Sequence, residues 1–211
     1  MKKTRLALIA GMICIAPATT ITAGCARKNP TATSPATTAS FALASAAFQN
    51  NGTLPAEYTC DGANGGHSPA LAWSGAPAGT ACFSLMMTTL ALDGKKWNWV
   101  LYGIPASVTA LAESTSGVGT AGLSSDGPER RYYPPCSQGP GLKTYTFTLY
   151  ALSGTPSFEV PADSVNGPAL VAAIGGMILD SCTLSVSYTR PAALSPQQWR
   201  DIDARCKSRR R

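Results

Sequence analysis

One stretch, residues 83–105, constrains the fold more than any other, because two apolar segments flank a short polar turn. The first segment, Phe83 to Thr89, is apolar at successive positions, which favours a strand covered on both faces. The second segment, Trp97 to Ile104, is rich in the aromatic and branched residues that suit a buried pleated surface. Asn98 lies between two tryptophans and is either a hydrogen-bonded core residue or part of a pocket wall.

Periodicity elsewhere predicts a mainly β domain. Residues 143–152 alternate apolar and polar side chains with period two, as a half-buried strand does, and residues 182–188 do the same. A helix is predicted over residues 164–178, with Pro168 in its first turn and an apolar stripe of Leu170, Val171, Ile174, Met177 and Ile178. A shorter helix is predicted from Ser195. The expected architecture is an antiparallel β-sandwich with peripheral C-terminal helices.

The N-terminal residues 1–24 have the pattern of a signal peptide, with basic residues followed by an apolar run over residues 6–15. That run is too short to span a bilayer. Residues 21–25 resemble a bacterial lipobox, which predicts a lipid on Cys25, although Thr22 departs from the usual pattern. The alternative is cleavage near residues 16–18 and a soluble periplasmic or secreted protein. Either interpretation places the protein in the bacterial cell envelope or beyond, with membrane contact through a lipid anchor only.

Composition sets the expected domain boundaries. Residues 25–40 form a Thr/Ala/Ser/Pro linker that is too poor in large apolar residues to bury a core, so it is expected to be disordered. The folded domain is expected over residues 41–190, and residues 191–211 form a helix and a basic tail. Eight of the 17 Lys and Arg residues lie in the leader and the tail, which leaves nine against 11 acidic residues. The body is therefore near neutral, and this excludes a nucleic-acid surface.

Export determines which of the seven cysteines are expected to form disulfides. Cys14 leaves with the leader and Cys25 carries the predicted lipid, so five remain in a compartment that favours disulfides. Five cannot all pair, and Cys206 in the tail is expected to be left over. Cys82 and Cys182, both in predicted strands, are either a disulfide across the core or two small buried apolar residues. With no C-x-x-C motif and one His, neither a metal site nor a cofactor is expected.

Several segments together resemble the phosphatidylethanolamine-binding protein family, in its bacterial Raf-kinase-inhibitor-like branch, over residues 41–190. They occur in the family's order and are Tyr58–Gly62, Ser68–Gly75, Asn98–Ala106, Pro135-Cys136 and Tyr145–Leu152. The resemblance implies an antiparallel β-sandwich with a small pocket at one end that takes phosphate-like headgroups. It also implies that the loops carrying Cys60 and Cys136 lie near this pocket, where a disulfide would staple it.

The sequence departs from the family pattern at the pocket itself. The family's two acids fall on Thr88 and Leu90, and its two pocket histidines fall on Asn98 and Lys143. The resemblance therefore gives a candidate ligand-binding set of Asp61, His67, Thr88, Asn98, Tyr132 and Lys143. Two interpretations follow from these departures. The cleft is either less negative and still accepts an anion, or it is filled and vestigial.

A non-enzymatic binding function is expected. A single His leaves no Ser-His-Asp or Cys-His arrangement, and His67 with Asp61 is either a dyad or, more simply, two residues of a solvated loop. One hypothesis is an exported binding protein for a small anionic ligand, either phosphate or a phospholipid headgroup. The other is a protein-interaction or inhibitor module with a vestigial pocket and an envelope protein as its partner.

Overall fold

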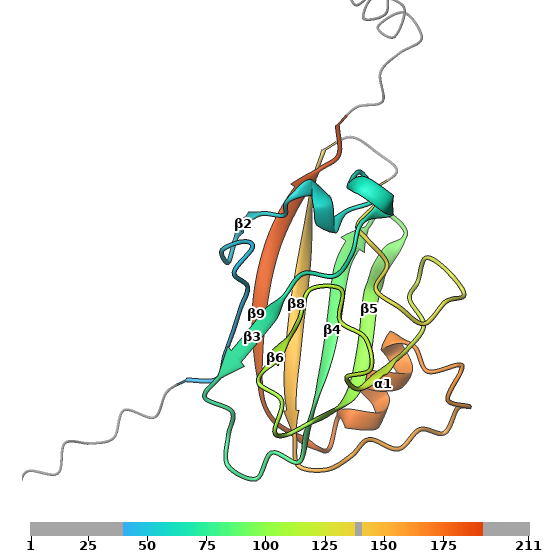
Figure 1. The fold of residues 1–211 in the computed structure, drawn as a ribbon. Coiled ribbons are helices and arrows are strands. Elements are labelled where there is room, and N and C mark those ends of the chain that lie inside the picture. Colours follow the sequence, from blue (N-terminus) through green and yellow to red (C-terminus); the bar gives the residue numbers. More distant parts are fainter. Residues whose placement is uncertain (1–39, 138–140, 192–211) are drawn as a thin grey trace, which may run out of the picture. The chain divides into compact units, whose positions relative to one another are not determined.

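The computed structural model describes residues 40–137 and 141–191. Within them the chain forms two sheets, one of six strands in the order β2-β9-β8-β4-β5-β7 and one of three in the order β1-β3-β6. The smaller sheet lies across one face of the larger (Figure 1). The elements are β1 (Ala42–Ala44), β2 (Gly52–Thr53), η1 (Ala56–Tyr58), η2 (Ala63–Gly65), β3 (Leu71–Ser74), β4 (Cys82–Ala91), β5 (Gly94–Pro105), β6 (Ala110–Leu111), β7 (Thr120–Ala121), β8 (Leu142–Leu152), α1 (Gly167–Ile174) and β9 (Ile178–Thr189).

The predicted hairpin is confirmed as β4 and β5, which pair antiparallel in the middle of the large sheet. β8 pairs with the other edge of β4, so β4 has a neighbour on each side. Its two faces are both covered, as expected from its continuous apolar run. Phe83 and Met87 join the core between the sheets, whereas Met86 joins a second cluster beneath α1. The mainly β architecture predicted from the sequence is therefore confirmed.

The alternating segment over residues 143–152 is confirmed as β8. Tyr145, Phe147, Leu149 and Ala151 are buried in the core between the sheets. The threonines between them are only partly buried or exposed. This alternation orients Tyr145, near the start of β8, toward the end of the inter-sheet core where the candidate site lies.

The helix α1 is shorter than the predicted 164–178. Asn166 caps it by accepting a hydrogen bond from the backbone N–H of Ala169 at 3.0 Å, which sets its start. Gly175 and Gly176 end it, because glycine is a poor helix former. Val171, predicted on the apolar stripe, is 50% exposed, and Ile178 already belongs to β9. No helix within the described ranges is long and apolar enough to cross a membrane.

Several predictions at the ends of the chain lie outside the described residues. These are the leader, the lipidation of Cys25, the linker over residues 25–40 except Ser40, the helix from Ser195 and the unpaired Cys206. They remain predictions.

The two disulfides considered for the described cysteines have different outcomes. Cys60 and Cys136 form a disulfide that joins residues 76 apart in the sequence. A disulfide between Cys82 and Cys182 is wrong, since both are buried free thiols. β8 separates β4 from β9, and the two thiols lie in different clusters, Cys82 beneath α1 and Cys182 between the sheets. Their alternative interpretation, as small buried apolar residues, holds.

Candidate functional site

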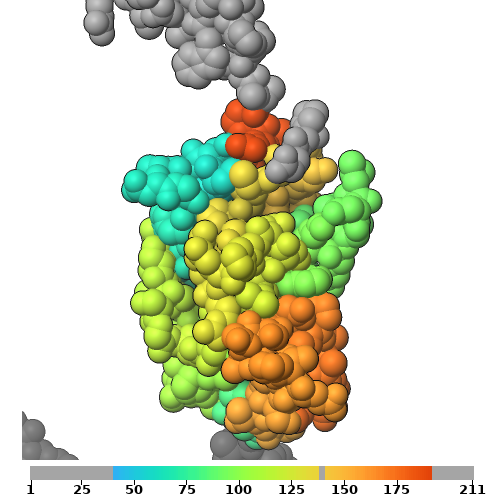
Figure 2. Space-filling view, turned by 90° about the vertical axis from the view of Figure 1, so that its right-hand side faces the viewer, coloured from blue at the N-terminus to red at the C-terminus, as the bar shows by residue number. Residues whose placement is uncertain are grey.

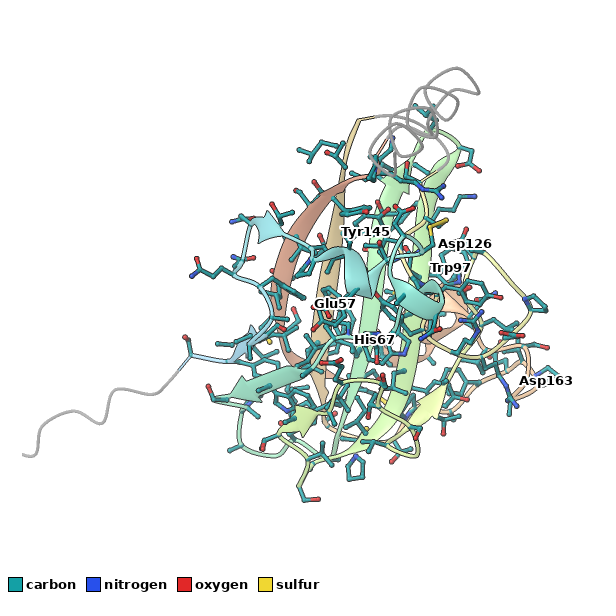
Figure 3. All side chains as sticks on the ribbon, turned by 45° about the horizontal axis from the view of Figure 1, so that its top comes forward. Glu57, His67, Trp97, Asp126, Tyr145 and Asp163 are labelled. Carbon is teal, nitrogen blue, oxygen red and sulfur yellow. A yellow bond between two sulfur atoms is a disulfide. The ribbon has the colours of Figure 1, made fainter. Side chains whose placement is uncertain are left out.

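A cleft of about 530 Å³ opens at the end of the large sheet where β4 turns into β5 and where β8 begins. Figure 3 shows two of its residues, Tyr145 and Asp126, at this end of the sheet. The cleft is lined by Thr89, Leu90, Ala91, Leu92, Asp93, Lys96, Asn98, Asp126, Cys136, Ser137, Lys143 and Tyr145. Two of the predicted ligand-binding residues, Asn98 and Lys143, therefore meet here.

A β-bulge positions Asn98 in the cleft. Met87 pairs with Trp99, but the next residue, Thr88, pairs with Trp97, so Asn98 is an extra residue on β5. A bulge of this kind redirects a side chain and leaves backbone groups available for other partners. The carbonyl of Asn98 accepts a hydrogen bond from the N–H of Tyr133 at 2.8 Å. The carbonyl of Trp97 accepts one from Ser125 at 2.8 Å, which brings the loop carrying Asp126 alongside.

The side chain of Asn98 is only 3% exposed and is incompletely paired. Its Nδ2 donates a hydrogen bond to Oδ2 of Asp126 at 3.2 Å. A carboxylate accepts but does not donate, so this contact fixes which end of the amide faces Asp126. Oδ1 of Asn98 is then left buried with no hydrogen-bond partner. A buried acceptor without a donor is costly, so this atom is suited to receive a donor from a bound molecule.

Charges of both signs surround this amide. Lys96 and Asp93 form an ion pair at 2.6 Å on the hairpin. Their hydrogen bond lowers the pKa of Asp93 and raises the pKa of Lys96. Among the ion pairs of the described residues none involves Lys143, so its ammonium is available to an anion in the cleft. Asp126 contributes a carboxylate that accepts the hydrogen bond from Asn98 and also helps to raise the pKa of Lys96.

Tyr145 contributes a neutral phenol to the cleft. Its side chain is buried, and burial raises the pKa of the phenol to about 12, with a further contribution from the Asp126 carboxylate. The hydroxyl therefore stays protonated at neutral pH and can donate a hydrogen bond.

The disulfide fixes another wall of the cleft. Cys136 lies in the lining, and its partner Cys60 also donates its backbone N–H to the carbonyl of Pro135 at 3.1 Å. The loop of residues 135–137 is thus held to the segment after η1 by a covalent bond and a hydrogen bond. This is the arrangement that the resemblance implied.

Asp61 and Thr88 lie outside the lining. Asp61 accepts hydrogen bonds from the Tyr188 hydroxyl at 2.9 Å and from Nε of Arg190 at 3.0 Å. Arg190 also donates to the carbonyl of Ser137 at 3.4 Å, so Asp61 supports the cleft wall indirectly. Thr88 pairs within the sheet, and its neighbour Thr89 is the threonine that lines the cleft.

Tyr132 and His67 also lie outside the lining. Tyr132 is buried, donates its hydroxyl to the carbonyl of Tyr58 at 2.7 Å, and contacts Trp99 edge-on, so its role in the fold is to join two loops. It borders a separate hollow of about 260 Å³. His67 contacts Glu113 at 2.6 Å and the ring of Tyr58. Because His67 and Asp61 have different partners, the structure does not join them as a dyad.

Six polar residues of the cleft lining were not predicted from the sequence, namely Thr89, Asp93, Lys96, Asp126, Ser137 and Tyr145. Tyr145 belongs to a segment that carries the family resemblance, so the sequence contained a signal for its place in the cleft. Lys96 precedes the bulge and could have been placed by the alternation of β5. Asp126 had no such signal, because only the hydrogen bonds of its loop to β5 bring it to the cleft. Among the described residues, no group of three or more His, Cys, Asp and Glu is placed to hold a metal ion.

Comparison with known sequences places this geometry in context. The family model described as phosphatidylethanolamine-binding protein matches residues 44–189. A UPF0098 protein of Methanothermobacter thermautotrophicus is 32% identical over 153 residues, covering 68% of this chain and 95% of that protein. A protein of Mycobacterium tuberculosis that is named as a lipoprotein, LppC, is 33% identical over 124 residues, covering 57% of this chain and 60% of its own length.

Solved structures agree with these matches. The crystal structure of CT736 from Chlamydia trachomatis, described as a homologue of phosphatidylethanolamine-binding protein, superposes with a TM-score of 0.65 at 28% identity. The match covers 72% of this chain and 99% of CT736. YbcL of Escherichia coli shares the fold with a TM-score of 0.63 at 23% identity, over 72% of this chain and all of YbcL.

Proposed function

Because the chain belongs to the phosphatidylethanolamine-binding protein family, we propose that it is a non-enzymatic binding protein whose cleft takes a small phosphate-bearing ligand. The observation that carries the proposal is the unpaired, buried Oδ1 of Asn98 in a cleft that also holds the available ammonium of Lys143. An unfilled volume of about 530 Å³ supports an open cleft over a vestigial one.

The polar groups of the cleft suit a ligand that has both an anionic and a donor group. Phosphate oxygens need donors, and Lys143 with the Tyr145 hydroxyl can supply them. An ammonium or hydroxyl group needs acceptors, and the Asp126 carboxylate with Oδ1 of Asn98 can supply those. Phosphoethanolamine combines the two groups in one small molecule, and inorganic phosphate carries only the first.

The surroundings of the cleft support binding without chemical conversion. The one His of the chain, His67, is paired with Glu113 away from the cleft. Cys136 is oxidised in a disulfide, so it offers no thiolate nucleophile. The hydroxyl of Thr89 donates to the carbonyl of Thr144 at 2.8 Å, so its proton is directed at a backbone carbonyl and not at a general base.

We further propose that the protein is exported and held to a membrane by a lipid on Cys25. The lipobox-like residues 21–25 support this, as does the similarity to a protein named as a lipoprotein. The test is metabolic labelling with an alkyne fatty acid in the native host. Labelling that Cys25→Ala abolishes is expected, and equal labelling of parent and variant would contradict the proposal.

The ligand proposal is tested by thermal unfolding of the full chain with three compounds, namely phosphate, ethanolamine and phosphoethanolamine. A bound ligand raises the melting temperature, because it stabilises only the folded state. Phosphoethanolamine is expected to raise it most, phosphate less and ethanolamine least. An unchanged melting temperature with all three at millimolar concentration would contradict an open binding cleft.

A further inference from the structure

Three leucines lie exposed at the end of the large sheet, and two of them, Leu90 and Leu92, also line the cleft. Leu92 is fully exposed, Leu90 is 77% exposed and Leu142 is 68% exposed. By comparison, Val171 on α1 is 50% exposed and Val160 is 39% exposed. Leu90, Leu92 and Leu142 are called the leucine patch below. Its exposure is a cost that a monomeric surface rarely carries without an interaction partner.

Strand alternation places Leu90 and Leu142 on one face. Thr89 of β4 pairs with Tyr145 of β8, so Leu90, still within β4, faces the same way as Leu142 of β8. Leu92 follows in the turn between β4 and β5. Leu90 pairs with Lys95 on the other side of β4. The hairpin end therefore presents leucines and a lysine together, and it protrudes from the body in Figure 2.

The opposite face of the same strand ends carries two lysines of the cleft. Lys96 pairs with Thr89, and Lys143 is two residues from Tyr145, so these lysines share the face that carries Tyr145. The cleft lining includes these residues together with Leu90 and Leu92. The leucine patch therefore forms part of the rim of the cleft and has lysines close to it.

We propose that the leucine patch inserts into the headgroup region of an anionic lipid bilayer and so presents the cleft to the membrane surface. Leucine side chains favour the apolar boundary, while lysines bury their stems and keep their ammonium groups at the anionic headgroups. This inference goes beyond the proposed function, since it concerns the exposed leucines at the rim of the cleft and does not require a ligand inside it. The lipid proposed at Cys25 would raise the local concentration, so that a weak insertion suffices.

Charge complementarity selects the bilayer over two other partners. Three lysines, Lys95, Lys96 and Lys143, lie at the strand ends that carry the patch. The nearby acids are two, Asp93, which is paired with Lys96, and Asp126 of the cleft, so positive charge is in excess. A second copy of the same patch would bring like charges together. Residues 205–211 include five basic residues, so this segment would also be repelled. An anionic surface alone among the three has the opposite charge.

Hydrogen exchange of the full chain on vesicles tests the inference locally, because peptides of the leucine patch are read separately from peptides of the N-terminal residues. Vesicles of phosphatidylcholine containing roughly one third phosphatidylglycerol are compared with phosphatidylcholine alone. Protection of peptides covering residues 88–97 and 142–149 is expected on the anionic vesicles only. Peptides covering residues 158–172, which carry Val160 and Val171, are expected to exchange as in solution.

Two double variants complete the test. Leu92→Asp/Leu142→Asp is expected to lose the protection and to bind anionic vesicles at least about tenfold more weakly. Val160→Asp/Val171→Asp, the matched control, is expected to behave as the parent. Equal vesicle binding by the leucine variant would overturn the inference. Protection without vesicles that increases with protein concentration would also overturn it, in favour of self-association.

A saturating concentration of soluble phosphoethanolamine separates this inference from the proposed function. Protection that persists in its presence supports insertion by the patch. Protection that it abolishes would show that headgroup binding in the cleft accounts for the effect, which contradicts the inference and supports the proposed function. Protection by vesicles of a chain whose melting temperature responds to no soluble ligand would support the inference and contradict the proposed function.

Discussion

The side-chain amide of Asn98 donates to the Asp126 carboxylate at 3.2 Å, and the same contact leaves the buried Oδ1 of Asn98 without a donor. The two residues belong to different parts of the fold. Asn98 is the extra residue of a bulge in β5, and Asp126 belongs to a loop that β5 holds by backbone hydrogen bonds. The end of the large sheet therefore contains a buried acceptor, Oδ1 of Asn98, that has no hydrogen-bond donor.

Asn98→Leu tests whether that amide serves the fold or a ligand. The variant removes both the unpaired acceptor and the hydrogen bond to Asp126, so its free energy of unfolding is expected to stay within about 1 kcal/mol of the parent. The rise in melting temperature with phosphoethanolamine is expected to fall sharply. A loss of several kcal/mol, measured by urea unfolding, would instead show that Asn98 is a structural core residue.

Tyr132→Phe should give the opposite pattern. The variant removes a buried hydrogen bond of 2.7 Å to the Tyr58 carbonyl but lies outside the cleft lining. Its free energy of unfolding is expected to fall by about 1–2 kcal/mol. The response of the melting temperature to phosphoethanolamine should persist, and its disappearance would place Tyr132 among the ligand-binding residues.

The disulfide between Cys60 and Cys136 closes a long loop, so it should stabilise the protein strongly. Cys60→Ser/Cys136→Ser is expected to lower the free energy of unfolding by about 2–4 kcal/mol. Reduction of the parent should give a similar decrease. The same reductant should leave the double variant unchanged, because Cys82 and Cys182 are already free thiols. A change in the double variant would indicate another disulfide.

The raised pKa of Tyr145 predicts that the protein loses stability at high pH. Its folded pKa of about 12 lies above the value of about 10 for an exposed tyrosine. Between these values the unfolded chain releases the phenolic proton while the folded chain retains it, so stability is present below pH 10 and is lost as the pH approaches 12. Tyr145→Phe should therefore lose less stability across this window, by about 1–2 kcal/mol in urea unfolding. Identical pH profiles would contradict the burial of the phenol.

The elements that follow from local patterns were predictable. β8 could be read from its strict alternation, and coverage of both faces of β4 from its continuous apolar run. The early end of α1 was not, because Val171 and Ile178 fit the apolar stripe and only tertiary packing decides that Ile178 joins β9. The wrong pairing of Cys82 with Cys182 has a similar origin, since no local pattern reveals that β8 separates their strands.

The candidate site was predictable only in part. Alignment to the family pattern pointed to Asn98 and Lys143, and both line the cleft. Asp61 and Tyr132 occupy positions beside it, where they hold loops together by hydrogen bonds. Asp126 could not be found, because its position depends on a bulge whose presence is a property of paired strands and not of one strand's sequence.

The most direct test of the central claim is calorimetric titration of phosphoethanolamine into the parent and three variants. Lys143→Met removes the available ammonium of the cleft, Asp126→Asn removes a carboxylate, and Lys95→Met is the matched control on the opposite face of the hairpin. Saturable binding is expected for the parent and for Lys95→Met, with at least about tenfold weaker binding for Lys143→Met and Asp126→Asn. No saturable binding by the parent, or equal affinity for all four proteins, would contradict the assignment of this cleft as the ligand site.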